Sequence, residues 1–193
     1  MPKVETFNRD LVIQQATEVF HSKGYNATSM QDLVDATGLN RSSIYNSFVS
    51  KLNLFMACLH TYQDKYQKKT STTLVKATNP LQAIELIFDL YLNEIIDNKD
   101  SRGCMITNCK SEMAKHDESI TNFLYSNQNQ TVGLLEGLVQ NAQDEQLINT
   151  SKTAHEYALY LFSSLQGFRM TGILISDRKE LESITKTILQ TLI

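Results

Sequence analysis

Proline and glycine are both scarce in this chain, which has two prolines and seven glycines among 193 residues. Tight turns are built largely from these residues, so their scarcity argues against a β-sandwich or barrel and favours long helices joined by short links. No apolar run approaches the roughly 20 residues of a membrane-spanning helix. The first ten residues, MPKVETFNRD, also lack the apolar core of a signal peptide. We therefore expect an all-α, cytoplasmic protein without a membrane segment.

Residue patterns for metal binding or catalysis are also missing. The three cysteines, Cys58, Cys104 and Cys109, are odd in number and lack a disulfide spacing, so reduced thiols are expected. Cys104, Cys109 and His116 are spaced too widely for the short cysteine pairs of structural zinc sites. No Ser-His-Asp order, HExxH sequence or glycine-rich phosphate loop is present. We expect no catalytic residue, no metal and no cofactor.

Charge is distributed unevenly along the chain. Residues 1–76 hold nine Lys or Arg and six Asp or Glu, a net charge of +3. Residues 77–193 hold nine against fifteen, a net charge of −6. A mildly basic first part and an acidic second part suggest that the two parts meet different partners.

Apolar periodicity and capping residues predict about nine helices. The four expected in the first part cover about 12–23, 30–37, 41–48 and 51–69. Their expected stops are Gly24 and Gly38, and their expected N-caps are Thr28, Asn40 and Ser50. The five expected in the second part cover about 80–97, 104–115, 118–139, 151–175 and 178–193, with Asp177 and Glu180 resembling a capping box for the last.

Residues 30–37 and 41–48 have the plan of a helix-turn-helix, two short helices joined by a glycine-containing turn. In that plan the second helix enters the DNA major groove, and the start of the first points its amides toward a phosphate. Arginine and asparagine read bases, while serine and threonine suit phosphates or bases. Such helix pairs also occur in proteins that do not bind DNA. The candidate DNA-binding residues are Thr28, Ser29, Arg41, Ser42, Ser43, Asn46 and Lys51.

The region from about residue 6 to 66 resembles the TetR/AcrR family of bacterial transcriptional repressors. The resemblance rests on Ala16, Phe20, Gly24-Tyr25, Thr28-Ser29, Asp32-Leu33, Ala36, the run GLNRSSIYNSF from Gly38 to Phe48, and Ser50-Lys51 with Leu54. It implies an all-helical homodimer with a DNA-binding domain at 6–66, whose motif covers about 29–48, and a ligand-sensing and dimerisation domain at 77–193. It further implies phosphate contacts from Thr28, Tyr45 and Lys51. It places Arg41, Ser43 and Asn46 at base edges.

Several of these residues also have a purely structural interpretation. The ring of Tyr45 would pack on the first helix, and Ser42 and Ser43 would simply face solvent. A solvated Lys51 in the first turn of its helix is poorly placed for the helix dipole, and a neighbouring phosphate removes that conflict. Asn40 is expected to cap the helix 41–48 and thereby to fix the direction of Arg41.

Aromatic and sulfur-containing residues of the second part are candidates to line an effector pocket, since such side chains adapt to small apolar ligands. The candidates are Phe88, Tyr91, Cys104, Met105, Phe123, Tyr160 and Phe168. Aromatic residues at helical spacing also form ordinary core. Cys104 has three interpretations: a structural thiol, a ligand contact, or a reactive thiol activated by a helix start and by Arg102.

The last two predicted helices are apolar on more than one face, so a partner chain is expected to cover one of the faces. The candidate dimer residues are Ala158, Leu161, Leu165, Phe168, Gly172, Leu181, Ile184 and Ile188. We interpret the chain as a homodimeric repressor that a small molecule releases from double-stranded, palindromic operator DNA. The alternatives are a helical carrier or enzyme with a vestigial helix-turn-helix, and an architectural DNA-binding protein without a ligand.

Overall fold

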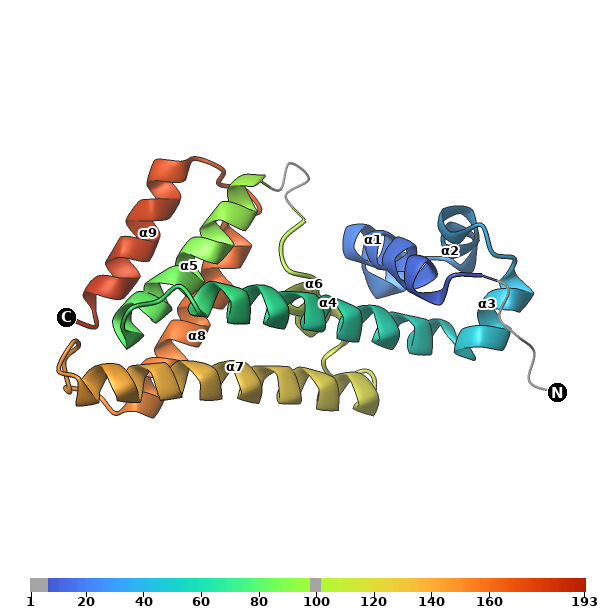
Figure 1. Cartoon of the computed structure of the whole chain (residues 1–193). Coiled ribbons are helices and arrows are strands. Elements are labelled where there is room, and N and C mark those ends of the chain that lie inside the picture. Colours follow the sequence, from blue (N-terminus) through green and yellow to red (C-terminus); the bar gives the residue numbers. More distant parts are fainter. Residues whose placement is uncertain (1–6, 98–101) are drawn as a thin grey trace. The chain divides into compact units, whose positions relative to one another are not determined.

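The structure is a computed structural model that describes residues 7–97 and 102–193. These residues form nine helices and no strand, which confirms the predicted all-α class (Figure 1). The helices are α1 (Arg9–Ala27), α2 (Met30–Thr37), α3 (Arg41–Phe48), α4 (Lys51–Leu74), α5 (Pro80–Asp97), α6 (Met105–Met113), α7 (Glu118–Asp144), α8 (Ala154–Thr171) and α9 (Arg178–Gln190). Residue 6, the first of the predicted DNA-binding domain, lies outside the described residues.

Helix boundaries follow the local signals closely. The side chains of Asn40, Ser50 and Asp177 each accept a hydrogen bond from the amide three residues ahead, at 2.8, 3.0 and 3.0 Å. Gly38 ends α2 with a φ of 68°, a left-handed conformation that glycine adopts without steric cost. These four predicted boundaries are confirmed, because caps and stops depend on neighbouring residues alone. The predicted stop at Gly24 is wrong: Gly24 interrupts α1, and the helix continues to Ala27.

The start of α2 corrects one predicted cap. Ser29, not Thr28, is the N-cap: its hydroxyl accepts from the Asp32 amide at 3.1 Å, and the Asp32 carboxylate accepts from the Ser29 amide at 2.8 Å. Thr28 is 1% exposed, and its hydroxyl donates to the Gly24 carbonyl at 2.6 Å. Both residues have cap-forming side chains, and Thr28 uses its own to close the end of α1.

The structure divides into two units, and the first consists of the residues up to Tyr66 together with Met105–Thr121. Within it α2 packs against both α1 and α3. Large side chains fill its core, and the rings of Phe20 and Phe55 meet edge to face with centroids 4.9 Å apart. Burial of Ile44 and Phe48 fixes which face of α3 points inward, and so which face remains free.

Helix α6 belongs to this first unit, although the sequence-based boundary places it in the second domain. It packs against α1, and the Met105 amide at its start donates to the Tyr62 hydroxyl at 3.4 Å. Four of its apolar residues, Met105, Ile106, Cys109 and Met113, are buried. Its partners therefore lie more than forty positions earlier in the chain, a relationship that local patterning does not reveal.

The second unit consists of Gln67–Cys104 and Asn122–Ile193. Here α5, α8 and α9 pack against one another, and α7 adds its buried side chains to the same apolar cluster. Asn79 precedes Pro80 at the start of α5, and its side chain accepts from the Gln82 amide at 2.9 Å, as its cap position predicts. Residues of four helices thus enclose the larger apolar cluster of this unit, and Leu92, Phe168 and Leu181 form a second, smaller one.

Candidate nucleic-acid interface

The outer face of α3 carries polar side chains over a firmly packed base. Arg41, Ser42 and Asn46 are exposed, and Tyr45 is 40% exposed. The guanidinium of Arg41 lies 5.8 Å from the centroid of the Tyr45 ring. The ring of Tyr45 therefore lies outside the core. The exposed face of α3 presents a guanidinium group, a side-chain amide and hydroxyl groups together.

Ser43 and Ser29, two further candidates, take part in the first turns of their helices. The Ser43 amide donates to Asn40, which fixes the first turn of α3. Ser29 is exposed and begins α2. Thr28, in contrast, presents almost no surface and its hydroxyl is already engaged, so the structure removes it from the candidate phosphate-binding residues.

A charge pair reinforces the start of α2. Lys23 Nζ lies 2.6 Å from an Asp32 carboxylate oxygen. This ammonium, together with the amide and hydroxyl of Ser29, lowers the pKa of Asp32 to about 2. Asp32 therefore stays ionised at neutral pH, where it can hold the Ser29 amide and hydroxyl.

Lys51 is half-buried rather than freely solvated. Its ammonium lies 4.3 Å from the centroid of the Tyr25 ring, a cation–π geometry. Burial lowers the pKa of Lys51 from its ordinary value, and the carboxylates of Glu112 and Asp32 oppose that shift. The ammonium thus lies against an aromatic ring, and two carboxylates favour its charged form.

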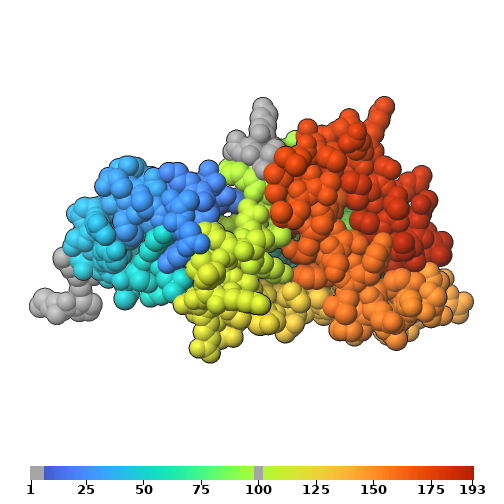
Figure 2. Space-filling view, turned by 180° about the vertical axis from the view of Figure 1, so that it is seen from behind, coloured from blue at the N-terminus to red at the C-terminus, as the bar shows by residue number. Residues whose placement is uncertain are grey.

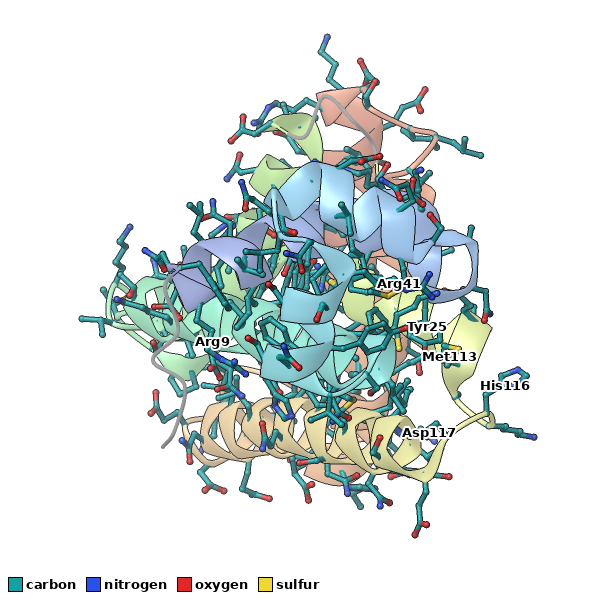
Figure 3. All side chains as sticks on the ribbon, turned by 90° about the vertical axis from the view of Figure 1, so that its right-hand side faces the viewer. Arg9, Tyr25, Arg41, Met113, His116 and Asp117 are labelled. Atoms are coloured by element: carbon teal, nitrogen blue, oxygen red, sulfur yellow. The ribbon has the colours of Figure 1, made fainter. Side chains whose placement is uncertain are left out.

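Arg9 is a site residue that the sequence analysis missed. Its Nη1 donates to the Ser47 carbonyl at 3.1 Å, and its guanidinium lies 4.2 Å from the centroid of the Phe48 ring. Arg9 and Arg41 are both labelled in Figure 3, which looks onto this part of the first unit. Arg9 is separated from Ser47 by 38 positions, so only the fold reveals that it supports the end of α3.

The predicted effector-pocket residues do not form one set. Phe88 and Phe168 are buried together in the second unit, with ring centroids 6.5 Å apart. Met105 belongs to the first unit, and Tyr160 is exposed on α8. Phe123 and Cys104 are buried in the second unit. Exposure of Tyr160 follows from its place on α8, on the side turned away from Leu161 and Leu165.

Tyr91 brings a polar group into the interior of the second unit. The guanidinium of Arg169 lies 4.3 Å from the centroid of its ring. Burial raises the pKa of Tyr91, and the charge of Arg169 opposes that shift. The pair joins α5 to α8 through a charged group and an aromatic ring.

The predicted dimer residues are a further correction. All of them except the half-buried Ile184 are buried within the single chain, namely Ala158, Leu161, Leu165, Phe168, Gly172, Leu181 and Ile188. They form the internal face of α8 and α9, so they are core residues. The free apolar face of α8 is the opposite one, where Leu159, Tyr160 and Met170 are exposed and Gly167 faces open space.

The thiols are all buried, and no disulfide joins them. Cys104 is 3% exposed, which disagrees with the interpretation of an accessible, reactive thiol. Burial raises the pKa of Cys58 to about 12 and that of Cys109 to about 12. Among residues 7–97 and 102–193, no group of three or more His, Cys, Asp or Glu is placed to hold a metal ion.

No helix in the described part of the chain is both long and apolar enough to span a membrane.

Comparisons with known proteins agree with this architecture. Residues 12–58 match the family described as "Bacterial regulatory proteins, tetR family", and residues 80–188 match "Tetracyclin repressor-like, C-terminal domain". The regulator CifR, of the TetR family, has been solved as a cysteine mutant complexed with 26-bp double-strand operator DNA. It shares the fold, with a TM-score of 0.84 and 20% identity over 97% of this chain and 98% of that chain.

Two curated relatives match over part of their length. The uncharacterized HTH-type transcriptional regulator YezE of Bacillus subtilis is 29% identical over 123 residues, which are 64% of this chain and 63% of that protein. The HTH-type transcriptional repressor ComR of Escherichia coli is 34% identical over 110 residues, which are 56% of this chain and 51% of that protein. The match therefore spans between one half and two thirds of these relatives.

Proposed function

The chain belongs to the TetR family of bacterial regulatory proteins, and we propose that it is a transcriptional repressor that binds operator DNA as a homodimer and is released by a small-molecule effector. The single observation that carries the proposal is the exposed face of α3. Arg41, Tyr45 and Asn46 project from a helix whose other side is anchored by Ile44 and Phe48. The proposed activity requires no catalytic step, and its target places the protein in the cytoplasm.

On the DNA, α3 lies in the major groove. Arg41 and Asn46 have the side chains that form paired hydrogen bonds with guanine and adenine, and Ser42 and Ser43 suit bases or phosphates. Tyr45, Lys51 and the start of α2 at Ser29 contact phosphates, which sets the register of the helix without reading sequence.

Assembly uses the free face of α8. A monomer would leave Leu159, Tyr160 and Met170 in water on one side of this helix, and a second copy of the chain covers them. Gly167 on the same side lets the two helices approach closely. The surface of α8 and α9 is coloured orange to red in Figure 2.

The effector acts on the second unit. Its interior offers aromatic rings at Phe88 and Phe168 for apolar contacts, and Tyr91 with Arg169 for polar ones. In a dimer the two reading helices must lie about 34–36 Å apart to reach successive major grooves. An effector that changes this spacing releases the DNA, so a ligand bound in the second unit controls binding by the first.

The test is fluorescence anisotropy with labelled duplexes from DNA flanking the gene, at several salt concentrations. A repressor binds one fragment far more tightly than random DNA, by a factor of about 10³ or more. Equal affinity for all fragments favours an architectural DNA-binding protein. No binding to any duplex favours the helical carrier.

A further inference from the structure

Helix α1 is interrupted one turn before its end. Gly24 has a φ of 78° and a ψ of 175°, a conformation that is essentially restricted to glycine. A break of this kind leaves the amides that follow it without acceptors from the preceding turn. The amides of Tyr25 and Asn26 therefore need acceptors from outside α1.

Glu112 supplies both acceptors. One carboxylate oxygen accepts from the Tyr25 amide at 2.9 Å, and the other accepts from the Asn26 amide at 2.6 Å. Hydrogen bonds from amides to an ionised carboxylate are stronger than those between neutral groups. Glu112 lies on α6, 86 to 87 positions further along the chain and outside the helix-turn-helix. Figure 3 labels Tyr25 and, one residue after Glu112, Met113.

The same segment positions Lys51. The Tyr25 ring, which Glu112 anchors through its backbone, is the surface against which the Lys51 ammonium lies. The ring is itself held by Phe55, with centroids 5.0 Å apart. Glu112 also acts on Lys51 directly, because its negative charge favours the charged form of the ammonium. Two independent effects of Glu112 therefore converge on one cation.

We infer that Glu112 is a positioning residue for DNA binding: by holding the amides of Tyr25 and Asn26 it fixes the ring that places the Lys51 ammonium for a phosphate. The inference rests on the proposed function and adds a residue of α6 to the determinants of affinity. It also explains why position 24 is a glycine, because a Cβ there would lie 2.8 Å from Glu112 Oε2. A side chain at position 24 would displace the carboxylate as well as strain the backbone.

Other charges around this segment are accounted for. Asp117 raises the pKa of Tyr25, as a contribution secondary to burial, and accepts hydrogen bonds from the amides of Ser119 and Ile120. Asp32 is held by Lys23 and by the capping interaction with Ser29. Asp117 and Asp32 therefore bind other groups, and Glu112 is the carboxylate that accepts from the Tyr25 and Asn26 amides.

The test compares Glu112→Gln and Glu112→Ala with the wild-type protein by anisotropy on operator and random duplexes across a salt series. Glutamine has a single acceptor oxygen, so it retains one of the two hydrogen bonds and removes the charge. We expect both variants to bind either duplex at least tenfold more weakly, and the slope of log affinity against log salt to fall by nearly one, as in Lys51→Ala. Glu118→Gln, an exposed glutamate at the start of α7, is the matched control and binds as the wild type does.

A double-mutant cycle separates positioning from general destabilisation. In a Lys51→Ala background, Glu112→Gln should cause little further loss of affinity, because the group that it positions is absent. Amide hydrogen exchange of the folded variants should quicken at Tyr25 and Asn26 specifically. Additive losses of affinity, an unchanged salt slope, or tighter binding by Glu112→Gln would each overturn the inference about Glu112. The proposed repressor function would still stand if the wild-type protein binds its operator. A wild-type protein that binds no duplex would overturn both.

Discussion

The guanidinium of Arg9 lies 4.2 Å from the centroid of the Phe48 ring and also donates to the carbonyl of Ser47. The first turn of α1 is thereby fixed to the last turn of α3. Since the carbonyls at a helix end lack intrahelical donors, a cation at this point satisfies one of them and complements the helix dipole. A residue with no part in the helix-turn-helix thus supports the helix proposed to read DNA.

Arg9→Ala should lower the free energy of unfolding by about 1–2 kcal/mol, through loss of the cation–π contact and the hydrogen bond. Arg9→Lys should recover only part of that loss, because an ammonium lacks the planar surface that lies on Phe48. Urea unfolding measures both. Arg178→Ala removes an exposed ion pair with Glu182 and a hydrogen bond to Asn93, and should cost less than Arg9→Ala.

Arg41→Ala and Asn46→Ala should weaken operator binding by about 1–3 kcal/mol each, with little change on random DNA, if each forms a paired base contact. Tyr45→Phe and Lys51→Ala should instead reduce binding to every sequence. Anisotropy with operator and scrambled duplexes distinguishes these patterns. Equal losses on both duplexes for Arg41→Ala would assign Arg41 to the phosphates.

Val49→Gly should raise the free energy of unfolding by about 1 kcal/mol. Val49 joins α3 to α4 with a φ of 66°, which a β-branched residue rarely adopts, and it is 73% exposed, so truncation sacrifices little packing. Val75→Gly is the matched control: that valine is also exposed but lacks a positive φ, so its replacement should not stabilise the protein. Thermal or urea unfolding of the three proteins decides the point.

Met170→Glu should convert a dimer into a folded monomer, because it places a charge on the exposed apolar face of α8. Light scattering after size exclusion should give about 44 kDa for the wild type, twice the chain mass of 21.9 kDa, and half that value for the variant. Leu165→Glu buries its charge inside the protomer and should abolish folding, which circular dichroism detects. A dimer that survives Met170→Glu would move the interface elsewhere.

Asp32 should stabilise the fold at neutral pH and lose this effect in acid. Its pKa is lowered from 3.8 to about 2, so its contribution is complete above pH 4 and disappears as the pH falls toward 2. The difference in unfolding free energy between wild type and Asp32→Asn should shrink over that interval.

Sequence reasoning succeeded where the cause is local. Asn40, Ser50 and Gly38 act on residues within four positions, so their patterns predict the end of α2 and the starts of α3 and α4. The choice of Thr28 over Ser29 as the N-cap of α2 was wrong, because both residues have side chains that can cap a helix. Only the backbone path after Gly24 decides between them.

The candidate site was predictable only in its exposed part. Arg41, Ser42 and Asn46 follow from helical spacing, since Ile44 and Phe48 identify the buried side, whereas Tyr45 is indicated by the family resemblance. For α8 the periodicity found an apolar stripe but could not tell the protomer's core from a surface for a partner, because both demand apolar residues. Arg9 and Glu112 act on residues 38 or more positions away, and no local pattern marks them.

The first unit is assembled from two separate stretches, so the chain passes between the units three times, after Tyr66, after Cys104 and after Thr121. A gene fragment that stops after Tyr66 would encode α1 to α3 and most of α4, without the helix that carries Glu112. Transfer of the first unit onto another sensor domain therefore has to include α6. Because α6 is separated from Tyr66 in the sequence, the foreign domain has to be inserted between the two stretches rather than fused to one end. A single crossover after Tyr66 would separate α6 from the other helices of the first unit.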